Sequence, residues 1–188
     1  MSIIDDIFQP IYGKPCWQVE QGYASFLTFE FGEPYLEITE PREPSKEASE
    51  KLRKRWARRN VFVHGQWHLW IYISDWRLFH QGQELAHSES TRKVIRKALL
   101  ELDGQKLTSV TVNKSYGSIF EFDLGGRLEV LPMDEFEKTA ELWLLYEPSG
   151  DVFTLRADGK YSHMPGDTPP EEEKWRSLRV SKAKAAVK

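Results

Sequence analysis

Two stretches of this chain repeat each other at a constant spacing. Residues 23–32 read Tyr-Ala-Ser-Phe-Leu-Thr-Phe-Glu-Phe-Gly, and residues 116–125, an offset of 93, read Tyr-Gly-Ser-Ile-Phe-Glu-Phe-Asp-Leu-Gly. Tyr, Ser, the second Phe and Gly are identical, and most other positions exchange like residues. A shorter echo follows, since residues 36–38 (Leu-Glu-Ile) resemble residues 128–130 (Leu-Glu-Val). The repeat predicts a duplicated β unit whose two halves pack around a pseudo-two-fold axis.

Both copies have the residue alternation of short antiparallel strands. Aromatic and β-branched residues alternate with polar ones between turns that contain Gly or Pro. We expect one hairpin per copy, at residues 32–34 and at residues 125–126. Residues 67–73 should form a central strand, because they are apolar on both faces apart from His68, and residues 142–146 echo them. The sequence therefore predicts an α+β fold, mainly antiparallel β, of two duplicated β-meander units with a few surface helices.

One clear helix is expected between the two copies. Apolar residues over 94–102 recur at helical spacing on one stripe, so the helix should lie across a sheet. Ser88 or Ser90 can cap its start, and Gly104 can end it. Residues 2–8 form a weaker counterpart, because they precede the first strand of the first copy.

The chain divides by pattern into three parts. Residues 1–102 form the first repeat unit, which includes a basic helical insertion at residues 44–60. Residues 103–165 form the second unit, and residues 166–188 form a C-terminal extension within one compact domain. The tail beyond about residue 180 has few apolar side chains to bury, so we expect it to be mobile.

Composition limits the classes of function. The chain has 188 residues, 26 Lys and Arg against 29 Asp and Glu, and a net charge of −3, which argues against a surface wholly devoted to nucleic acid or anionic lipid. The single cysteine, Cys16, cannot form an internal disulfide, so a reducing compartment is expected. No signal peptide or membrane-spanning run is apparent, and we expect a cytoplasmic protein that does not enter membranes. The oligomeric state is left open.

The basic insertion is the largest difference between the copies. Residues 46–59 hold seven basic and two acidic side chains, and a helix there would have a thin apolar stripe through Leu52 and Trp56. One interpretation is a solvated helix whose Trp56 docks on the sheet. The other is a site for phosphate, on a nucleotide or a nucleic acid, because guanidinium groups suit phosphate oxygens. The candidate binding residues are Arg53, Arg55, Arg58, Arg59, Trp56 and His68.

The two histidines of His64-Gly-Gln-Trp-His68 have a spacing that binds zinc from a helix. The segment reads as a strand, however, and four residues of strand span roughly 13 Å, which is too far for one metal ion. We therefore expect no metal and no cofactor, and we expect His68 to form a hydrogen bond in or beside the core.

Acidic residues recur at matching places in the two copies. Glu30 aligns with Asp123, and Glu37 aligns with Glu129. A pseudo-two-fold axis can bring such carboxylates together for acid–base chemistry or metal binding. The alternative is that Glu30 and Asp123, on the strand face opposite the Phe residues, simply meet water.

Three segments resemble a bacterial family of uncharacterised proteins. They are residues 31–38 (Phe-Gly-Glu-Pro-Tyr-Leu-Glu-Ile), residues 67–72 (Trp-His-Leu-Trp-Ile-Tyr) and residues 142–150. The resemblance covers most of residues 7–168, but it implies no activity and no functional residue. The shorter units also resemble small β-rich domains of bacterial immunity and accessory proteins.

These observations favour a binding or accessory module that interacts with a protein partner and is not an enzyme. No nucleophile paired with a base, no metal cluster and no phosphate-binding glycine loop emerges from the sequence. The alternative is an enzyme or binder that acts on a phosphorylated ligand or nucleic acid through residues 46–59. A deep pocket that gathers the recurring carboxylates would favour the enzyme.

Overall fold

The computed structural model describes residues 2–43, 45, 47–133 and 138–180. The tail beyond residue 180, which the sequence predicts to be mobile, lies outside these residues. In chain order the elements are α1 (Ile3–Phe8), β1 (Cys16–Gln21), β2 (Leu27–Thr39), α2 (Glu50–Trp56), β3 (Asn60–Ile71), β4 (Asp75–His80), β5 (Gln83–His87), α3 (Arg92–Leu99), β6 (Leu107–Val112), β7 (Ser118–Phe122), β8 (Gly126–Leu131), β9 (Glu141–Tyr146), β10 (Asp151–Arg156), β11 (Lys160–Pro165), the 3₁₀ turn η1 (Pro170–Glu172) and β12 (Arg176–Ser177).

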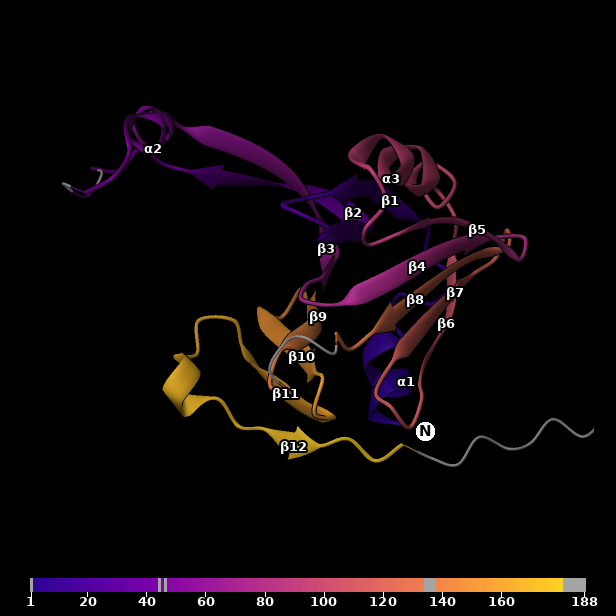
Figure 1. Cartoon of the computed structure of the whole chain (residues 1–188). Helices are drawn as coiled ribbons and strands as arrows, with labels where there is room; N and C mark the ends of the chain where they lie inside the picture. Colours follow the sequence, from indigo (N-terminus) through magenta and orange to yellow (C-terminus); the bar gives the residue numbers. More distant parts are fainter. Residues whose placement is uncertain (1, 44, 46, 134–137, 181–188) are drawn as a thin grey trace, which may run out of the picture.

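The strands form two antiparallel sheets (Figure 1). The large sheet has the order β1-β2-β3-β9-β10-β11-β12, and the small sheet has the order β5-β4-β8-β7-β6. Three short α-helices accompany the sheets within the described residues. The predicted α+β fold with mainly antiparallel sheet is therefore confirmed.

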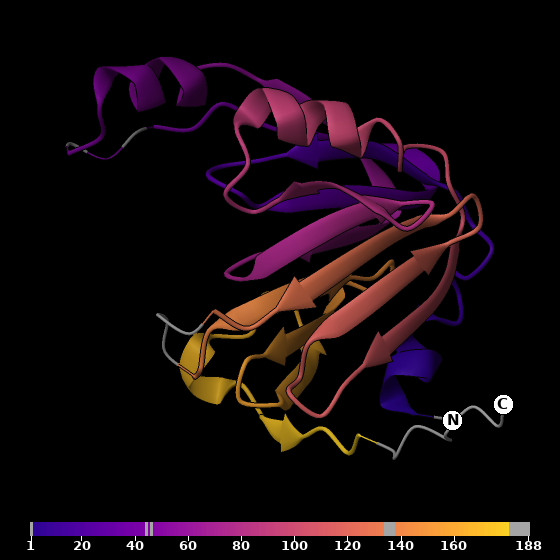
Figure 2. The ribbon, with the colours of Figure 1, turned by 45° about the vertical axis from the view of Figure 1, so that its right-hand side comes forward.

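Each half of the chain contributes strands to both sheets. The chain leaves the large sheet after β3, turns at Ser74 and enters the small sheet as β4; it returns to the large sheet as β9 after β8. The prediction of a central strand at residues 67–73 is correct as to its place, because β3 lies between β2 and β9. Figure 2 shows β4, β8, β7 and β6 as one layer, with the orange and yellow strands of the large sheet behind it.

The hydrophobic core lies between the sheets and is rich in aromatic rings. Phe29 of β2 stacks on Phe122 of β7 with ring centroids 6.5 Å apart. Trp76 and Trp143 are both fully buried. Their indole N–H groups donate to the Ser25 carbonyl at 2.7 Å and to the Ser118 hydroxyl at 2.8 Å, so neither buried donor is left without an acceptor.

Both predicted flanking helices are present. α1 begins at a reciprocal cap in which the Ser2 hydroxyl accepts from the Asp5 amide and the Asp5 carboxylate accepts from the Ser2 amide. α3 buries Ile95, Ala98 and Leu99 of its predicted stripe, whereas Val94 is exposed, and the helix packs against β1 and β5. Its N-terminal cap position is Thr91, not Ser88 or Ser90, because those hydroxyls bond to Asp75 and to the His87 amide.

The predicted hairpin at residues 32–34 is wrong, whereas the hairpin at residues 125–126 joins β7 to β8 as expected. β2 runs through Gly32 to Thr39, and the turn signal is instead a β-bulge between Phe31 and Pro34 opposite β3. Close approach explains the glycine on the partner strand, because a Cβ at Gly65 would lie 2.5 Å from the Phe31 carbonyl oxygen.

Beyond this bulge, β2 and β3 leave the sheet as a two-stranded ribbon. Among the described strands, β1 pairs with β2 only up to Phe31, and β9 pairs with β3 only from His68 onward. Residues 34–39 and 60–65 therefore pair only with each other. We call residues 34–65 the arm; it extends away from the body and carries α2 near its tip (Figure 1).

Candidate functional site

The arm exposes a patch of aliphatic side chains. Leu36 faces Val63 and Ile38 faces Val61 across the ribbon, so the four side chains share one face. Their exposed fractions run from 41 to 62%, although aliphatic side chains are usually buried. We call these four residues the aliphatic patch. An exposed apolar cluster on a projecting element is typical of an interaction surface.

The tip of the arm is cationic, as the sequence predicts, but its helix is shorter than residues 46–59. α2 covers Glu50–Trp56, and Ser49 is its N-terminal cap. No α2 residue is buried. The central carbon of the Arg42 guanidinium lies 4.3 Å from the centre of the Trp56 ring, and Trp56 is partly buried.

The four arginines singled out from the sequence all lie exposed in or beside α2. Arg53 donates to the Ala48 carbonyl at 2.9 Å, and Arg59 bonds to the Glu40 carboxylate at 3.0 Å. Arg55 lies 6.0 Å from the Phe62 ring centre, and Arg58 is exposed. His68 is not part of this group, because it lies in the sheet beyond the arm's root.

A second group of polar side chains lies where the arm joins the large sheet. The Glu30 carboxylate contacts two imidazoles through one oxygen, with His68 Nδ1 at 2.7 Å and His64 Nδ1 at 3.1 Å. Its other oxygen accepts from the Gly65 amide at 2.8 Å. Glu30 is only 3% exposed, so the expectation that it faces water is wrong. His68 forms the hydrogen bond predicted for it. We call Glu30, His64 and His68 the root cluster.

Strand register brings the root cluster together. Glu30 and His68 are direct cross-strand partners, and His64 lies four residues along β3 on the same face. The bulge lies between these positions, and the ligand atoms of all three side chains lie within 4.8 Å of one another. The expectation that the two histidines are too far apart to share one ion is therefore wrong. The pairing is irregular beside the bulge, and the two imidazoles reach toward each other, with ring centroids 5.8 Å apart.

Opposing effects act on the Glu30 carboxyl. Burial raises its pKa, but hydrogen bonds from His68, the Gly65 amide and His64, with the charge of His68, outweigh burial and lower the pKa below its ordinary value. The carboxylate is therefore ionised at neutral pH. Glu37 adds a second acid, because its carboxylate lies 3.1 Å from His64 Nε2.

The recurring carboxylates do not gather at one place. Glu30 and Glu37 share His64, but Asp123 accepts from the Lys106 amide at 2.8 Å, and Glu129 pairs with Arg127. Of these four carboxylates, the structure thus brings together Glu30 and Glu37.

Cys16 has no feature of a nucleophile. It is fully buried, and its thiol lies 3.1 Å from the Leu102 carbonyl oxygen. Burial and the nearby Asp103 raise the pKa of the thiol to about 12. The thiolate that nucleophilic chemistry requires is therefore scarce at neutral pH.

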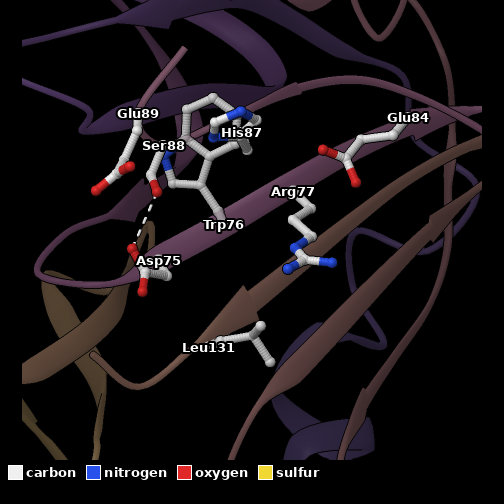
Figure 3. A pocket seen from close by; sticks show the side chains of 8 residues that line it. All are labelled: Asp75, Trp76, Arg77, Glu84, His87, Ser88, Glu89 and Leu131. Atoms are coloured by element: carbon white, nitrogen blue, oxygen red, sulfur yellow. Dashed lines mark hydrogen bonds between the residues drawn. The ribbon is translucent and has the colours of Figure 1, made fainter. Parts of the chain in front are cut away.

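One surface hollow of about 500 Å³ lies beside β4 and β5 (Figure 3). Three acids and one arginine give it mixed charge, and Ser88 bonds to Asp75 at its edge at 3.0 Å. Its lining residues are Asp75, Trp76, Arg77, Glu84, His87, Ser88, Glu89 and Leu131. None of the recurring carboxylates, the four arginines or the root cluster lines this hollow.

Comparisons with known proteins found no matching family model, no similar curated protein and no solved structure of similar fold. The resemblance to a bacterial family of uncharacterised proteins therefore stays a prediction. No helix in the described part of the chain is long and apolar enough to cross a membrane.

Proposed function

We propose that this protein is a non-catalytic binding module that uses the arm to hold an acidic protein partner. The observation that carries the proposal is the arm itself, which places an exposed aliphatic patch beside a cationic tip. Residues 46–59 carry a charge of +5 on a chain of −3. A surface that offers both apolar area and positive charge matches an apolar groove with an acidic rim.

The low stability expected of an isolated ribbon supports the proposal that a partner binds the arm. A two-stranded hairpin is marginally stable in water unless it packs on something else. Here residues 34–39 pair only with residues 60–65, and the aliphatic patch meets solvent. Covering four aliphatic side chains is favourable by about 25 cal/mol for each Å² of apolar area removed from water. Contact with the patch would therefore increase the affinity of a partner and stabilise the ribbon.

A protein fits the arm better than a nucleic acid. Phosphate binding uses the arginines but leaves the aliphatic patch exposed, whereas a protein partner can cover both. The enzyme alternative requires a pocket that gathers carboxylates near His68 or α2. Glu30 and Glu37 gather beside His64 and His68, but the hollow beside β4 is lined by other residues.

We also propose that the fold consists of two copies of one unit related by a pseudo-two-fold axis. The order β1-β2-β3-β9-β10 in the large sheet matches β6-β7-β8-β4-β5 in the small sheet. Reciprocal hydrogen bonds support the axis: the Gly13 amide donates to the Leu107 carbonyl, and the Gly104 amide donates to the Cys16 carbonyl. An offset of 91 residues exchanges the members of these two bonds.

Aromatic residues support the same axis. Phe29 and Phe122, which are repeat equivalents, stack on each other, as positions beside a two-fold axis would. Under this proposal the counterpart of Trp143 is Trp76 of β4, although the sequence echo pairs residues 142–146 with residues 67–73. The second copy then begins before α3, near residue 90, and not at residue 103. Only the first copy carries an arm, so the arm is the part added to a shared scaffold, where specialised binding is expected.

Affinity capture from the native host tests the proposed function. The bait is the full chain, beside a variant in which the four arginines are reversed to Glu and a variant with Leu36→Ser and Val63→Ser. We expect a protein that survives nuclease treatment and is lost with either variant. The matched control is Leu100→Ser, which changes an aliphatic residue outside the arm that is 72% exposed.

Other outcomes contradict the proposal. Loss of the captured material with nuclease identifies nucleic acid as the ligand. Capture that survives both arm variants places the binding surface elsewhere, and recovery of the bait with itself alone identifies self-association.

A further inference from the structure

We propose that the root cluster is a binding site for a divalent transition metal ion of the zinc class. The site takes its three ligands from Glu30, His64 and His68, at the point where the arm leaves the large sheet. This inference is independent of the identity of any partner. It rests on the donor types, their separations and the hydrogen-bonding partners of His64.

Both ring nitrogens of His64 face carboxylates, so the ring carries either a second proton or a metal ion. Nδ1 faces the Glu30 carboxylate at 3.1 Å, and Nε2 faces the Glu37 carboxylate at 3.1 Å. An ionised carboxylate only accepts hydrogen bonds, and a neutral imidazole carries a single N–H. One ring nitrogen of neutral His64 would therefore turn a lone pair toward an anion. A second proton or a metal ion at Nδ1 removes this conflict, and a metal ion there leaves Nε2–H to donate to Glu37.

The separations suit a single ion after small side-chain rotations. Zinc bonds to nitrogen and oxygen are about 2.0–2.2 Å long, so ligand atoms in a tetrahedral site lie roughly 3.4 Å apart. The Glu30 oxygen lies 2.7 and 3.1 Å from the two imidazole nitrogens, and all the ligand atoms lie within 4.8 Å. Glu30 is already held by the Gly65 amide, so its orientation is fixed before metal binds.

The surroundings supply the outer features of a metal site. Glu37 stands behind His64 as the carboxylate of a carboxylate–histidine–metal arrangement, which fixes the imidazole tautomer and raises its basicity. The side chains of His64 and His68 are 28% and 23% exposed, so water can reach a fourth position. Two imidazoles and one carboxylate favour zinc and its neighbours over calcium or magnesium, which prefer oxygen ligands.

The position of the site gives it a mechanical consequence. His64 and Glu37 belong to the arm, whereas Glu30 and His68 belong to the part of the sheet that other strands flank. A bound ion therefore ties the ribbon to the body by direct bonds. We expect zinc to slow amide hydrogen exchange at residues 60–65 and to leave exchange in α3 unchanged.

Titration of the metal-free full chain with Zn²⁺ at pH 7.5 tests the proposal. Calorimetry should give one ion per chain, and Co²⁺ should give the intense visible absorption of a tetrahedral nitrogen–oxygen site. Because a metal ion and a proton compete for the same imidazole nitrogen, affinity should fall as pH falls.

Variants separate this site from adventitious binding. Loss of a residue that hydrogen-bonds to a metal ligand weakens metal affinity by about 10–100-fold, and we expect a loss of this size for Glu37→Gln. Glu30→Gln, His64→Gln and His68→Gln each remove a ligand and should weaken affinity by more. The matched control is His163→Gln, which breaks another histidine–carboxylate contact, to Glu147, on the same sheet. Its affinity should equal that of the wild type.

Three results would overturn the proposal: no stoichiometric Zn²⁺ binding by the wild type, binding that survives His68→Gln, or binding lost with His163→Gln. Circular dichroism of each variant checks its fold. If Glu30→Gln is unfolded, His68→Gln and Glu37→Gln still decide the question, because both residues are partly exposed.

Discussion

Replacing Glu30 with Gln tests the hydrogen-bond network at the root of the arm. The carboxylate accepts from Gly65 and contacts both imidazoles, and it is 3% exposed. An amide has one acceptor oxygen and turns an NH₂ group toward one of these donors. An unsatisfied buried donor costs about 1–3 kcal/mol, and the remaining bonds lose the strength that a charged acceptor gives. We therefore expect Glu30→Gln to lower the free energy of unfolding by about 2–4 kcal/mol.

Urea unfolding followed by tryptophan fluorescence at pH 7, with a chelator present, measures this loss without a metal contribution. The control is Glu37→Gln, which changes a carboxylate on the same imidazole that is 55% exposed and should cost less than about 1 kcal/mol. A Glu30→Gln protein as stable as the wild type within about 0.5 kcal/mol would refute the reasoning, because the burial cost would then cancel the bonds.

The loss of stability in Glu30→Gln should depend on pH. Hydrogen bonding lowers the folded-state pKa of Glu30 below its ordinary value of 4.5 despite burial. The carboxylate therefore contributes its stability above about pH 4.5 and loses it as pH falls through the folded-state pKa. The difference in stability between wild type and Glu30→Gln should be largest near pH 7 and should shrink in acid. A difference that grows in acid would contradict this sign.

Further predictions concern the arm tip, the core and the cysteine. Reversing the four arginines to Glu should change the melting temperature little in a thermal scan, because exposed charges contribute little each; a loss of many degrees would place them in a buried network. Phe29→Ala and Phe122→Ala should each cost about 3–5 kcal/mol in urea unfolding, with a coupling of about 0.5–1.5 kcal/mol in the double variant because the rings stack; additive losses would count against the stacking. Cys16 should resist a thiol reagent in the folded protein and react in urea, because burial raises the pKa of its thiol to about 12; rapid labelling of the folded chain would contradict this.

Local patterns in the sequence were sufficient to predict the helix α3, the antiparallel strands and the fold class. The stripe over residues 94–102 predicted α3, because its burial depends only on helical periodicity. Alternation of apolar and polar residues likewise predicted antiparallel strands and the central place of β3. The fold class was therefore predictable from short segments.

The bulge and the root cluster were not predictable in this way. Gly32-Glu33-Pro34 has the residues of a turn, and only the pairing of β2 with β3 decides that it is a bulge. Glu30 meets His68 through the same pairing, across 38 positions in the sequence. One signal was available: glycines stand in both strands, at Gly32 and Gly65, beside a pair of histidines. That combination indicates close approach of two backbones, not a flat strand.

The basic tip was predictable as charge but not as geometry. Seven basic residues within residues 46–59 indicated a cationic surface. Nothing in that segment alone indicated that it lies on a ribbon, because the ribbon depends on residues 34–39 pairing with residues 60–65 beyond the reach of β1 and β9.

Amide hydrogen exchange of the full chain, alone and with its captured partner, tests the central claim most directly. If the arm holds the partner, exchange should slow at residues 34–39, at residues 60–65 and in α2, and exchange at the hollow beside β4 should be unchanged. Protection of the hollow or of α3, with an arm that exchanges as fast as in the free protein, would contradict the account.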